Sequence, residues 1–377
     1  MRIGRTVVVF VALTLWATAI EGAAADPGVV WHRQPAFSVE SAAADGEGHV
    51  YVAGFAPRGE PLPFGRPLVM VLAKFDRGGQ RLWTRTWRSG IDFYPNAMGF
   101  DVSVSPDARD VYVAGAVMND SGEAGKARVW AYGSTGRLRW VGHTPRVGPW
   151  AAVVATPGGP VAGSGQIAAW TRDGAFRWSS SFQDRTGDYC AQIADLGLGP
   201  DGEIYAVGML DVVPTCNDSE GGAFVDADIA IQRRTPTTGA LRWSKILRDA
   251  GERDNDRAFA VDVAGGRVFV AGTDDARAWL TRMRPSGGIV WTRHWGEDAR
   301  AASVSVAPWG PVYALADRPA GIVLREYTPA NGELRSMWTR PRASAWSAAA
   351  VTTGWGGTLY VAAFAWDDTG DLWRLAP

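Results

Sequence analysis

Val50-Tyr51-Val52-Ala53-Gly54 and Val111-Tyr112-Val113-Ala114-Gly115 are two copies of one short pattern that recurs along the chain. Further copies are Ile204-Tyr205-Ala206-Val207-Gly208 and Val268-Phe269-Val270-Ala271-Gly272. Weaker copies stand at 160–163, 312–315 and 359–362. Alternating β-branched and aromatic residues that end at a glycine are typical of β-strands. The recurrence therefore predicts a repeated all-β unit.

Tryptophan recurs at the same spacing as these strands. We predict the repeat positions to be Trp31, Trp83, Trp140, Trp178, Trp243, Trp291 and Trp338. Most follow a strand and a glycine turn, as in Lys74–Trp83, and glycine supplies the positive φ that a hairpin turn needs. We expect each indole to begin an outer strand and cover the gap between neighbouring units. Repeats of roughly 40–65 residues built from short strands are typical of a β-propeller, with one four-stranded blade per repeat.

The two ends of the chain are out of phase with the repeat. Leu372-Trp373-Arg374-Leu375 is a third strand with no fourth after it. The missing strand is at the other end, because Val29–Arg33 matches Leu82–Arg85. We predict one all-β domain over residues 26–377, a seven-bladed β-propeller of four-stranded antiparallel blades closed by its N-terminal strand. Closure removes exposed sheet edges.

Residues 1–25 read as a secretory signal peptide. Arg2 and Arg5 precede an apolar run from Val7 to Leu15, and Ala23-Ala24-Ala25 follows. A charged segment, an apolar segment and small residues in this order are typical of such peptides. The run is shorter than the roughly 20 residues of a membrane-spanning helix. We expect cleavage after Ala25 and a secreted or periplasmic protein.

The charge balance limits the partners. The chain has 38 Lys and Arg against 39 Asp and Glu. Nucleic acids and anionic membranes need a basic surface, so neither is an expected partner. We expect a monomer with no membrane span.

The two cysteines predict a disulfide. Cys190 lies where the first strand of the fourth blade begins, and Cys216 lies in a long connection of that blade. Cysteines of an exported chain are expected to oxidise. A Cys190–Cys216 bridge would hold that connection against the blade.

Long connections should gather on one face of the ring. Strands in a blade alternate in direction, so connections between second and third strands share a face with the links between blades. The long segments all belong to this set, and they are 55–67, 88–98, 117–127, 209–227 and 248–257. Long loops on a rigid scaffold are the usual place for binding.

Acidic and aromatic residues in these segments are the candidate ligand-binding residues. They are Asp92, Tyr94, Asp211, Asp218, Glu220, Asp254 and Asp256. Carboxylates of this kind can bind calcium. The spacing does not match a known calcium loop, and a solvated acidic surface is the alternative interpretation. We therefore predict no metal site.

The sequence offers little for histidine-based catalysis. His32, His143 and His294 fall on outer strands, and His49 falls in a short turn on the opposite face. Gly163-Ser164-Gly165 lacks the pattern and context of a nucleophile elbow. We predict no catalytic residue.

Taken together, the strand pattern and the glycine–tryptophan turns resemble the seven-bladed β-propeller repeat family of bacterial exported proteins. They are also similar to the propeller repeats related to pyrroloquinoline-quinone enzymes. The latter resemblance implies blade-to-blade docking by the recurrent tryptophan. Quinone dehydrogenases of this type use eight blades and an adjacent cysteine pair, whereas this chain has seven repeats and separated cysteines.

The sequence favours an exported, non-catalytic interaction module that binds a protein or a cell-surface glycan through its long-loop face. The alternative is a propeller enzyme, either a quinone- or metal-dependent oxidoreductase or a hydrolase or lyase, with its site at the axial mouth. Paired carboxylates at that mouth would favour the enzyme. No cofactor is predicted, and calcium and a quinone stay open.

Overall fold

The computed structural model describes most of the chain. The described residues are 28–58, 67–91, 95–119, 124–143, 151–182, 190–211, 227–247, 256–274, 276–307, 310–341, 346–354, 357–365 and 369–376. Every regular element in these ranges is a β-strand.

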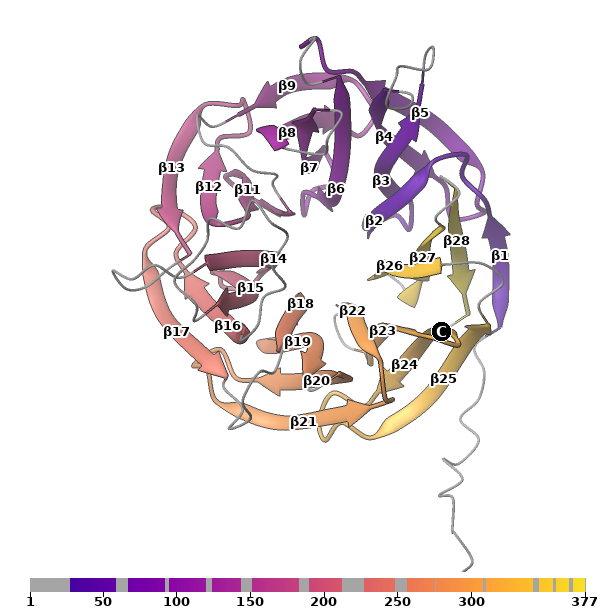
Figure 1. Cartoon of the computed structure of the whole chain (residues 1–377), viewed down its shortest axis with the longest axis vertical. Coiled ribbons are helices and arrows are strands. Elements are labelled where there is room, and N and C mark those ends of the chain that lie inside the picture. The colour runs from indigo at the N-terminus through magenta and orange to yellow at the C-terminus, as the bar shows by residue number, and fades with distance from the viewer. Residues whose placement is uncertain are drawn as a thin grey trace, which may run out of the picture.

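The strands form seven four-stranded sheets arranged as blades around a central axis (Figure 1). Blades one to three are β2(Ser38–Ala44), β3(Val50–Pro57), β4(Leu68–Phe75), β5(Arg81–Trp87); β6(Asn96–Val104), β7(Asp110–Met118), β8(Ala124–Gly133), β9(Leu138–Gly142); and β10(Ala152–Thr156), β11(Gly159–Gly163), β12(Gln166–Trp170), β13(Phe176–Ser181). Blades four and five are β14(Cys190–Leu198), β15(Ile204–Asp211), β16(Ala227–Arg234), β17(Leu241–Leu247); and β18(Arg257–Ala264), β19(Arg267–Asp274), β20(Arg277–Met283), β21(Ile289–Trp295). Blades six and seven are β22(Arg300–Val306), β23(Val312–Arg318), β24(Gly321–Tyr327), β25(Leu334–Pro341); and β26(Trp346–Thr353), β27(Leu359–Ala365), β28(Gly370–Leu375), β1(Val29–Arg33).

The predicted closure is confirmed. Strand β1 is the outer strand of blade seven, paired antiparallel with β28, with His32 opposite Trp373. The Ala376 backbone N–H donates to the Gly28 carbonyl at 2.8 Å, which continues the ladder past both strands. The first and last described segments of the chain therefore share one sheet.

The recurrent apolar strands are the second strands of the blades, as predicted. Residues Val50 to Ala53 are fully buried, and so are Val111, Val113 and Ala114. Each blade packs against a neighbour on both of its faces, so these strands have no solvent face. This explains their nearly continuous apolar sequence in place of an alternating one.

A tryptophan on the outer strand docks each of six blades onto the next. Trp83 Nε1, for example, donates to the Ser134 carbonyl in the turn between the third and fourth strands of blade two, at 3.3 Å. The same bond joins Trp31 to Arg77, Trp140 to Arg172, Trp178 to Pro236, Trp243 to Pro285 and Trp291 to Pro329. The receiving turn always contains a positive-φ glycine beneath the ring: Gly79, Gly136, Gly174, Gly239, Gly287 or Gly332.

The prediction for Trp338 is wrong. In blade one, Tyr51 pairs with Lys74, and Lys74 pairs with Trp83. In blade six, the equivalent Tyr313 pairs with Glu326, and Glu326 pairs with Ser336. Ser336 therefore occupies the repeat position, and Trp338 lies two residues later. Its ring packs edge-on against Trp373 of blade seven, with ring centroids 5.6 Å apart. Blade seven has no turn between its third and fourth strands, because they come from opposite ends of the chain, so no glycine turn can receive an indole there.

The docking contact predicts a specific cost for filling the glycine position. Gly136→Ala would place a Cβ 2.9 Å from the Trp83 ring at a residue with φ of 79°. Gly202 has the same φ with no atom within 4 Å of an added Cβ, so Gly202→Ala carries the backbone strain alone. We expect Gly136→Ala to destabilise by about 1–3 kcal/mol more than Gly202→Ala, the usual cost of overpacking. Thermal and urea unfolding measure the difference, and equal losses would contradict the docking role.

Candidate functional site

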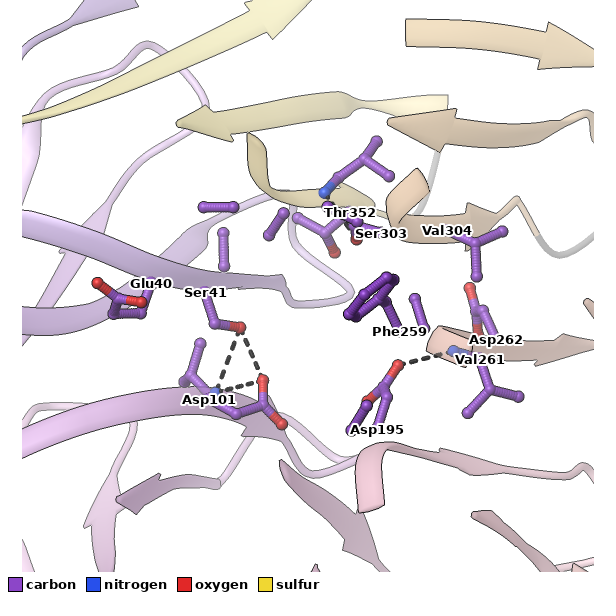
Figure 2. A pocket seen from close by; sticks show the side chains of 18 of the residues that line it. Glu40, Ser41, Asp101, Asp195, Phe259, Val261, Asp262, Ser303, Val304 and Thr352 are labelled. Carbon is purple, nitrogen blue, oxygen red and sulfur yellow. Dashed lines mark hydrogen bonds between the residues drawn. The ribbon is translucent and has the colours of Figure 1, made fainter. Parts of the chain in front are cut away.

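The innermost strands of the blades surround an axial cavity of about 330 Å³ (Figure 2). Four acidic residues from four blades line it: Glu40, Asp101, Asp195 and Asp262. Hydroxyl groups of Ser41, Ser103, Ser303, Ser305 and Thr352 line it as well. Lysine, arginine and histidine are absent from its lining among the described residues. The axial cavity is therefore rich in hydrogen-bond acceptors.

β-Bulges present Glu40 and several apolar side chains to the axis. The register shifts by one residue in the innermost strand of six blades, for example between Gly99 and Asp101 in blade two. The extra residue of each bulge lies in the cavity lining, and these residues are Glu40, Phe100, Ala194, Phe259, Ala302 and Ala349. A bulge aims a side chain differently from a regular strand. Two phenylalanine rings and Glu40 thus reach the axis together.

The polar axial side chains also join the blades. Except for Glu40, each accepts a hydrogen bond from a backbone N–H on the innermost strand of the next blade, an edge that faces the axis and has no strand partner. Asp101 accepts from Val153 at 2.7 Å, and Asp195 accepts from Val261 at 2.8 Å. The remaining bonds run from Val102 to Ser41, Ala155 to Ser103, Val306 to Asp262, Val351 to Ser303, Thr353 to Ser305 and Ala44 to Thr352. At the junction of blades three and four, a backbone group takes the place of an axial side chain: the Ser164 carbonyl accepts a hydrogen bond from the Ile193 N–H at 2.9 Å.

Burial makes the axial carboxyls weak acids. It raises the pKa of Asp101 to about 6, against the opposing effect of hydrogen bonds from Val153, Ser41 and Val102. Burial, followed by the charge of Asp101, raises the pKa of Asp195 well above its ordinary value. Burial also raises the pKa of Asp262 and of Glu40. Since like charges in one confined space oppose each other's ionisation, the axial cavity favours retaining protons.

Sequence reasoning missed the axial carboxyls. The signal was present, because each of the three aspartates has apolar residues on both sides of it within its strand, as in Phe100-Asp101-Val102. An aspartate disfavours strand structure unless the fold uses its oxygens. Nothing local in the sequence shows that three such strands, far apart along the chain, meet at one axis.

The structure places few of the predicted ligand-binding residues. Asp92, Tyr94, Asp218, Glu220 and Asp254 lie outside the described residues, and Asp211 is the last residue of β15. Asp256 is buried, with 4% of its surface exposed, so it does not belong to a solvated acidic surface. Cys190 begins β14 and Cys216 lies outside the described residues, so the disulfide stays a prediction.

His32, His49 and His294 lie where the sequence predicted and have acidic partners that it did not reveal, whereas His143 lies just past the end of β9 and not on the strand. His32 Nε2 contacts Asp371, and His294 Nε2 lies 2.5 Å from Asp274 Oδ2. His49 Nδ1 lies 2.9 Å from Asp45 Oδ2, and Glu47 completes a group with metal-binding geometry. Asp45 Oδ1 also accepts the backbone N–H groups of Glu47 and His49, and these bonds form the turn between β2 and β3. The turn accounts for the group without an ion.

Comparisons with known proteins agree on the fold. No family model and no curated protein matches the chain. Among solved structures, that of U3-55K superimposes with a TM-score of 0.62 at 9% identity, over 93% of this chain and 100% of that one. The WD40 domain of Neurospora crassa Pan2 gives 0.56 at 12% identity, over 91% and 90% of the two chains. Kuenenia stuttgartiensis hydrazine synthase gives 0.56 at 11% identity, over 91% and 95%. At this identity the likeness extends to the seven-bladed β-propeller fold alone.

The described part of the chain contains no helix that is long and apolar enough to cross a membrane.

The axial carboxyls predict how stability depends on pH. A carboxyl whose pKa is raised on folding stabilises the fold fully below its unfolded pKa, near 4, and this contribution is lost as pH rises through the folded value, about 6 for Asp101. We expect Asp101→Asn to make the loss of thermal stability between pH 4.5 and 7 shallower. Asp173→Asn, at an exposed turn position, is the control and should leave the slope unchanged. Parallel slopes for the wild type and Asp101→Asn would contradict the raised pKa.

Proposed function

We propose that this protein is an exported interaction module that binds a protein partner through the long connections on one face of its propeller. The observation that supports this most is the uneven distribution of connection lengths. Strand β15 ends at Asp211 and β16 begins at Ala227. Likewise, β17 ends at Leu247 and β18 begins at Arg257. All connections of this length lie on the same face, because second-to-third connections and blade links share it.

The long connections are further confined to one arc of that face. They join β3 to β4, β5 to β6, β9 to β10, β13 to β14, β15 to β16 and β17 to β18, all between blades one and five. The corresponding connections of blades six and seven are short, as between Arg318 and Gly321. Insertions tolerated at random would be spread over both faces and all blades. A binding arc on a rigid ring accounts for their concentration.

The candidate residues from the sequence belong to the same arc. Asp92 lies in the link between blades one and two, and Asp218 and Glu220 lie in the second connection of blade four. The likeness to a WD40 domain supports an interaction module. Binding by long loops on a propeller does not require catalysis.

Export is part of this proposal. We expect residues 1–25, fused to alkaline phosphatase, to carry the enzyme out of the cytoplasm, and a fusion that begins at Asp26 to leave it inside. The exported chain should begin at Asp26, and a Cys190–Cys216 bridge would make its intact mass lower by two hydrogens. Cytoplasmic retention of the first fusion would exclude export.

The binding arc can be tested by photo-crosslinking in the exported compartment. We expect p-benzoylphenylalanine at Asp92 or Asp218 to give adducts heavier than the chain, because both positions belong to the long connections of the proposed binding arc. The matched control is the same residue at Asp201, in the turn between β14 and β15 on the opposite face. Equal adducts from Asp201, or adducts from no position, would contradict binding through the arc.

A propeller enzyme is the second candidate, and one observation favours it. Asp101 has a pKa of about 6, within the range of a general acid or base at neutral pH, and it accepts a hydrogen bond from Ser41 Oγ at 2.7 Å. Both Asp101 oxygens, however, also hold backbone N–H groups, those of Val102 and Val153. These bonds account for the axial aspartate structurally, so the interaction module remains the better-supported function.

A further inference from the structure

At the junctions of blades one and two, three and four, and five and six, the gap is filled by a pair of side chains at equivalent positions near the long-connection face. One member stands four residues after the repeat tryptophan, and the other lies at the middle of the third strand of the next blade. Between blades one and two the pair is Trp87 and Trp130, with ring centroids 5.3 Å apart. Between blades three and four it is Phe182 and Gln232, and the Gln232 amide donates to the Phe182 carbonyl at 2.6 Å.

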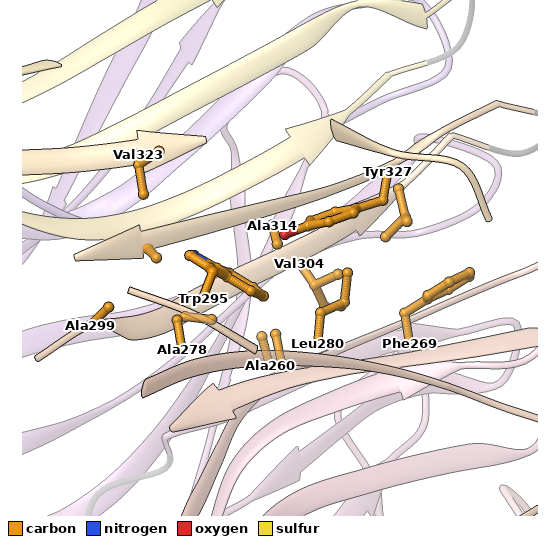
Figure 3. Close-up of a cluster of buried hydrophobic side chains, with 14 of the residues drawn as sticks. Ala260, Phe269, Ala278, Leu280, Trp295, Ala299, Val304, Ala314, Val323 and Tyr327 are labelled. Carbon is orange, nitrogen blue, oxygen red and sulfur yellow. The ribbon is translucent and has the colours of Figure 1, made fainter. Parts of the chain in front are cut away.

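Blades five and six show the same arrangement with a different partner. Figure 3 shows Trp295 beside Ala278, and both belong with Ala299 and with Ala314 of blade six to one buried cluster. The Arg325 guanidinium lies 5.5 Å from the centre of the Trp295 ring, and Tyr327 lies 5.8 Å from it. At these three junctions, a large side chain at one or both positions therefore fills the gap between the blades.

Blades four and five lack such a side chain. The register places Leu247 and Thr281 at the two positions, in place of Trp87 and Trp130. A cavity of about 350 Å³ remains, here called the four–five cavity. Ile229, Leu247 and Ile289 give it aliphatic walls, and Trp279, Thr281, Thr292, His294, Asp256 and Asp274 complete the lining. It lies beside the ends of the two long connections that flank β16 and β17.

A hydrogen-bond donor at this cavity has no acceptor. Trp279 is 2% exposed, and its Nε1 has no hydrogen-bond partner in the described part of the chain. The indole N–H groups of Trp130 and Trp295 are also without an acceptor in the described residues, but these rings pack against Trp87 and Tyr327 at their own junctions. An unpaired buried N–H costs free energy, which a ligand oxygen in the cavity would recover.

The chemistry of the lining is complementary to a peptide. Aliphatic walls suit a branched aliphatic side chain, the unpaired Trp279 N–H suits a carbonyl, and carboxylate oxygens suit an amide N–H. His294 and Asp274 form an ion pair 2.5 Å apart when the histidine is protonated. With Asp256 also in the lining and no lysine or arginine among the described lining residues, an acidic ligand is disfavoured.

We propose that the four–five cavity binds a leucine-like residue of an extended peptide segment, whose backbone carbonyl accepts a hydrogen bond from Trp279 Nε1. This inference rests on the proposed function and deepens it, because it names the segment that a protein partner presents to the long-connection arc. Filling the cavity with an aliphatic residue restores the packing that the tryptophan pair gives at the junction of blades one and two. A cavity of a few hundred Å³ suits one side chain with its flanking amides.

The test uses N-acetyl-leucinamide as the probe and the Trp279 indole resonance in a ¹H–¹⁵N spectrum of the mature chain as the readout. Trp279→Phe assigns the resonance. We expect the probe to shift it, and N-acetyl-glycinamide to bind at least about tenfold more weakly, the factor expected from burying a leucine side chain. N-acetylglucosamine is the glycan arm and should leave the resonance in place.

Leu247→Trp should close the cavity in the way that Trp87 closes the first junction, raising the thermal midpoint and abolishing the probe shift. Leu241→Trp, at an exposed position of the same strand, is the matched control and should bind like the wild type. Leu247→Phe, which copies the phenylalanine found at Phe182, is a second filling variant in case the tryptophan disrupts the blade. An unmoved Trp279 resonance at tens of millimolar probe, equal binding by the filled variants, or a shift with N-acetylglucosamine alone would each overturn the proposal. If the wild type does not bind the probe, but p-benzoylphenylalanine at Asp92 or Asp218 still gives adducts that Asp201 does not give, this inference is wrong and the proposed function stands.

Discussion

The ring depends on one contact at its outer rim, the indole of an outer strand seated on the glycine turn of the next blade. The indole N–H needs a free carbonyl, and the turn offers one only if a positive-φ glycine leaves room for the ring, as Gly136 does for Trp83. This requirement couples the glycine and tryptophan positions in the sequence. It also explains the exception at blade six. Blade seven is assembled from both ends of the chain and has no such turn, so Ser336 replaces the tryptophan and Trp338 packs on Trp373.

The inner rim solves a different problem. Seven innermost strands present unpaired N–H groups to the axis, and unsatisfied backbone donors are costly where water is restricted. Serine or threonine oxygens satisfy them where they occur, but Asp101, Asp195 and Asp262 perform the same task with a carboxyl. The cost is electrostatic, because burial raises the pKa values of all three groups, and the charges of Asp101 and Asp262 raise that of Asp195 further. The chain thus uses ionisable groups where neutral hydroxyls perform the same task, and stability becomes dependent on pH.

The sequence predicted the features that repeat and missed those that do not. Blade number, strand order and closure by Val29–Arg33 follow from periodicity, because every copy reports the same local geometry. The misassignment of Trp338 arose because a tryptophan two residues out of register looks like a repeat member until strand pairing is known. The axial aspartates and the pair of His294 and Asp274 were not predicted, since both depend on which distant strands meet. Most candidate loop residues lie outside the described ranges, so the sequence remains the basis for assigning them.

Departures from the repeat are informative when nothing compensates for them, because a repeat fold sets its own standard for each position. The axial aspartates are compensated departures, since their oxygens still join one blade to the next. Leu247 and Thr281 are different: they leave about 350 Å³ unfilled where other junctions hold Trp87 or Trp295, and an indole N–H nearby has no acceptor. Both defects reduce stability, and a single substitution at Leu247 would remove the larger of them. Local rules broken without compensation are expected at functional sites. That reasoning favours the four–five cavity over the axial cavity as the place where this propeller meets its partner.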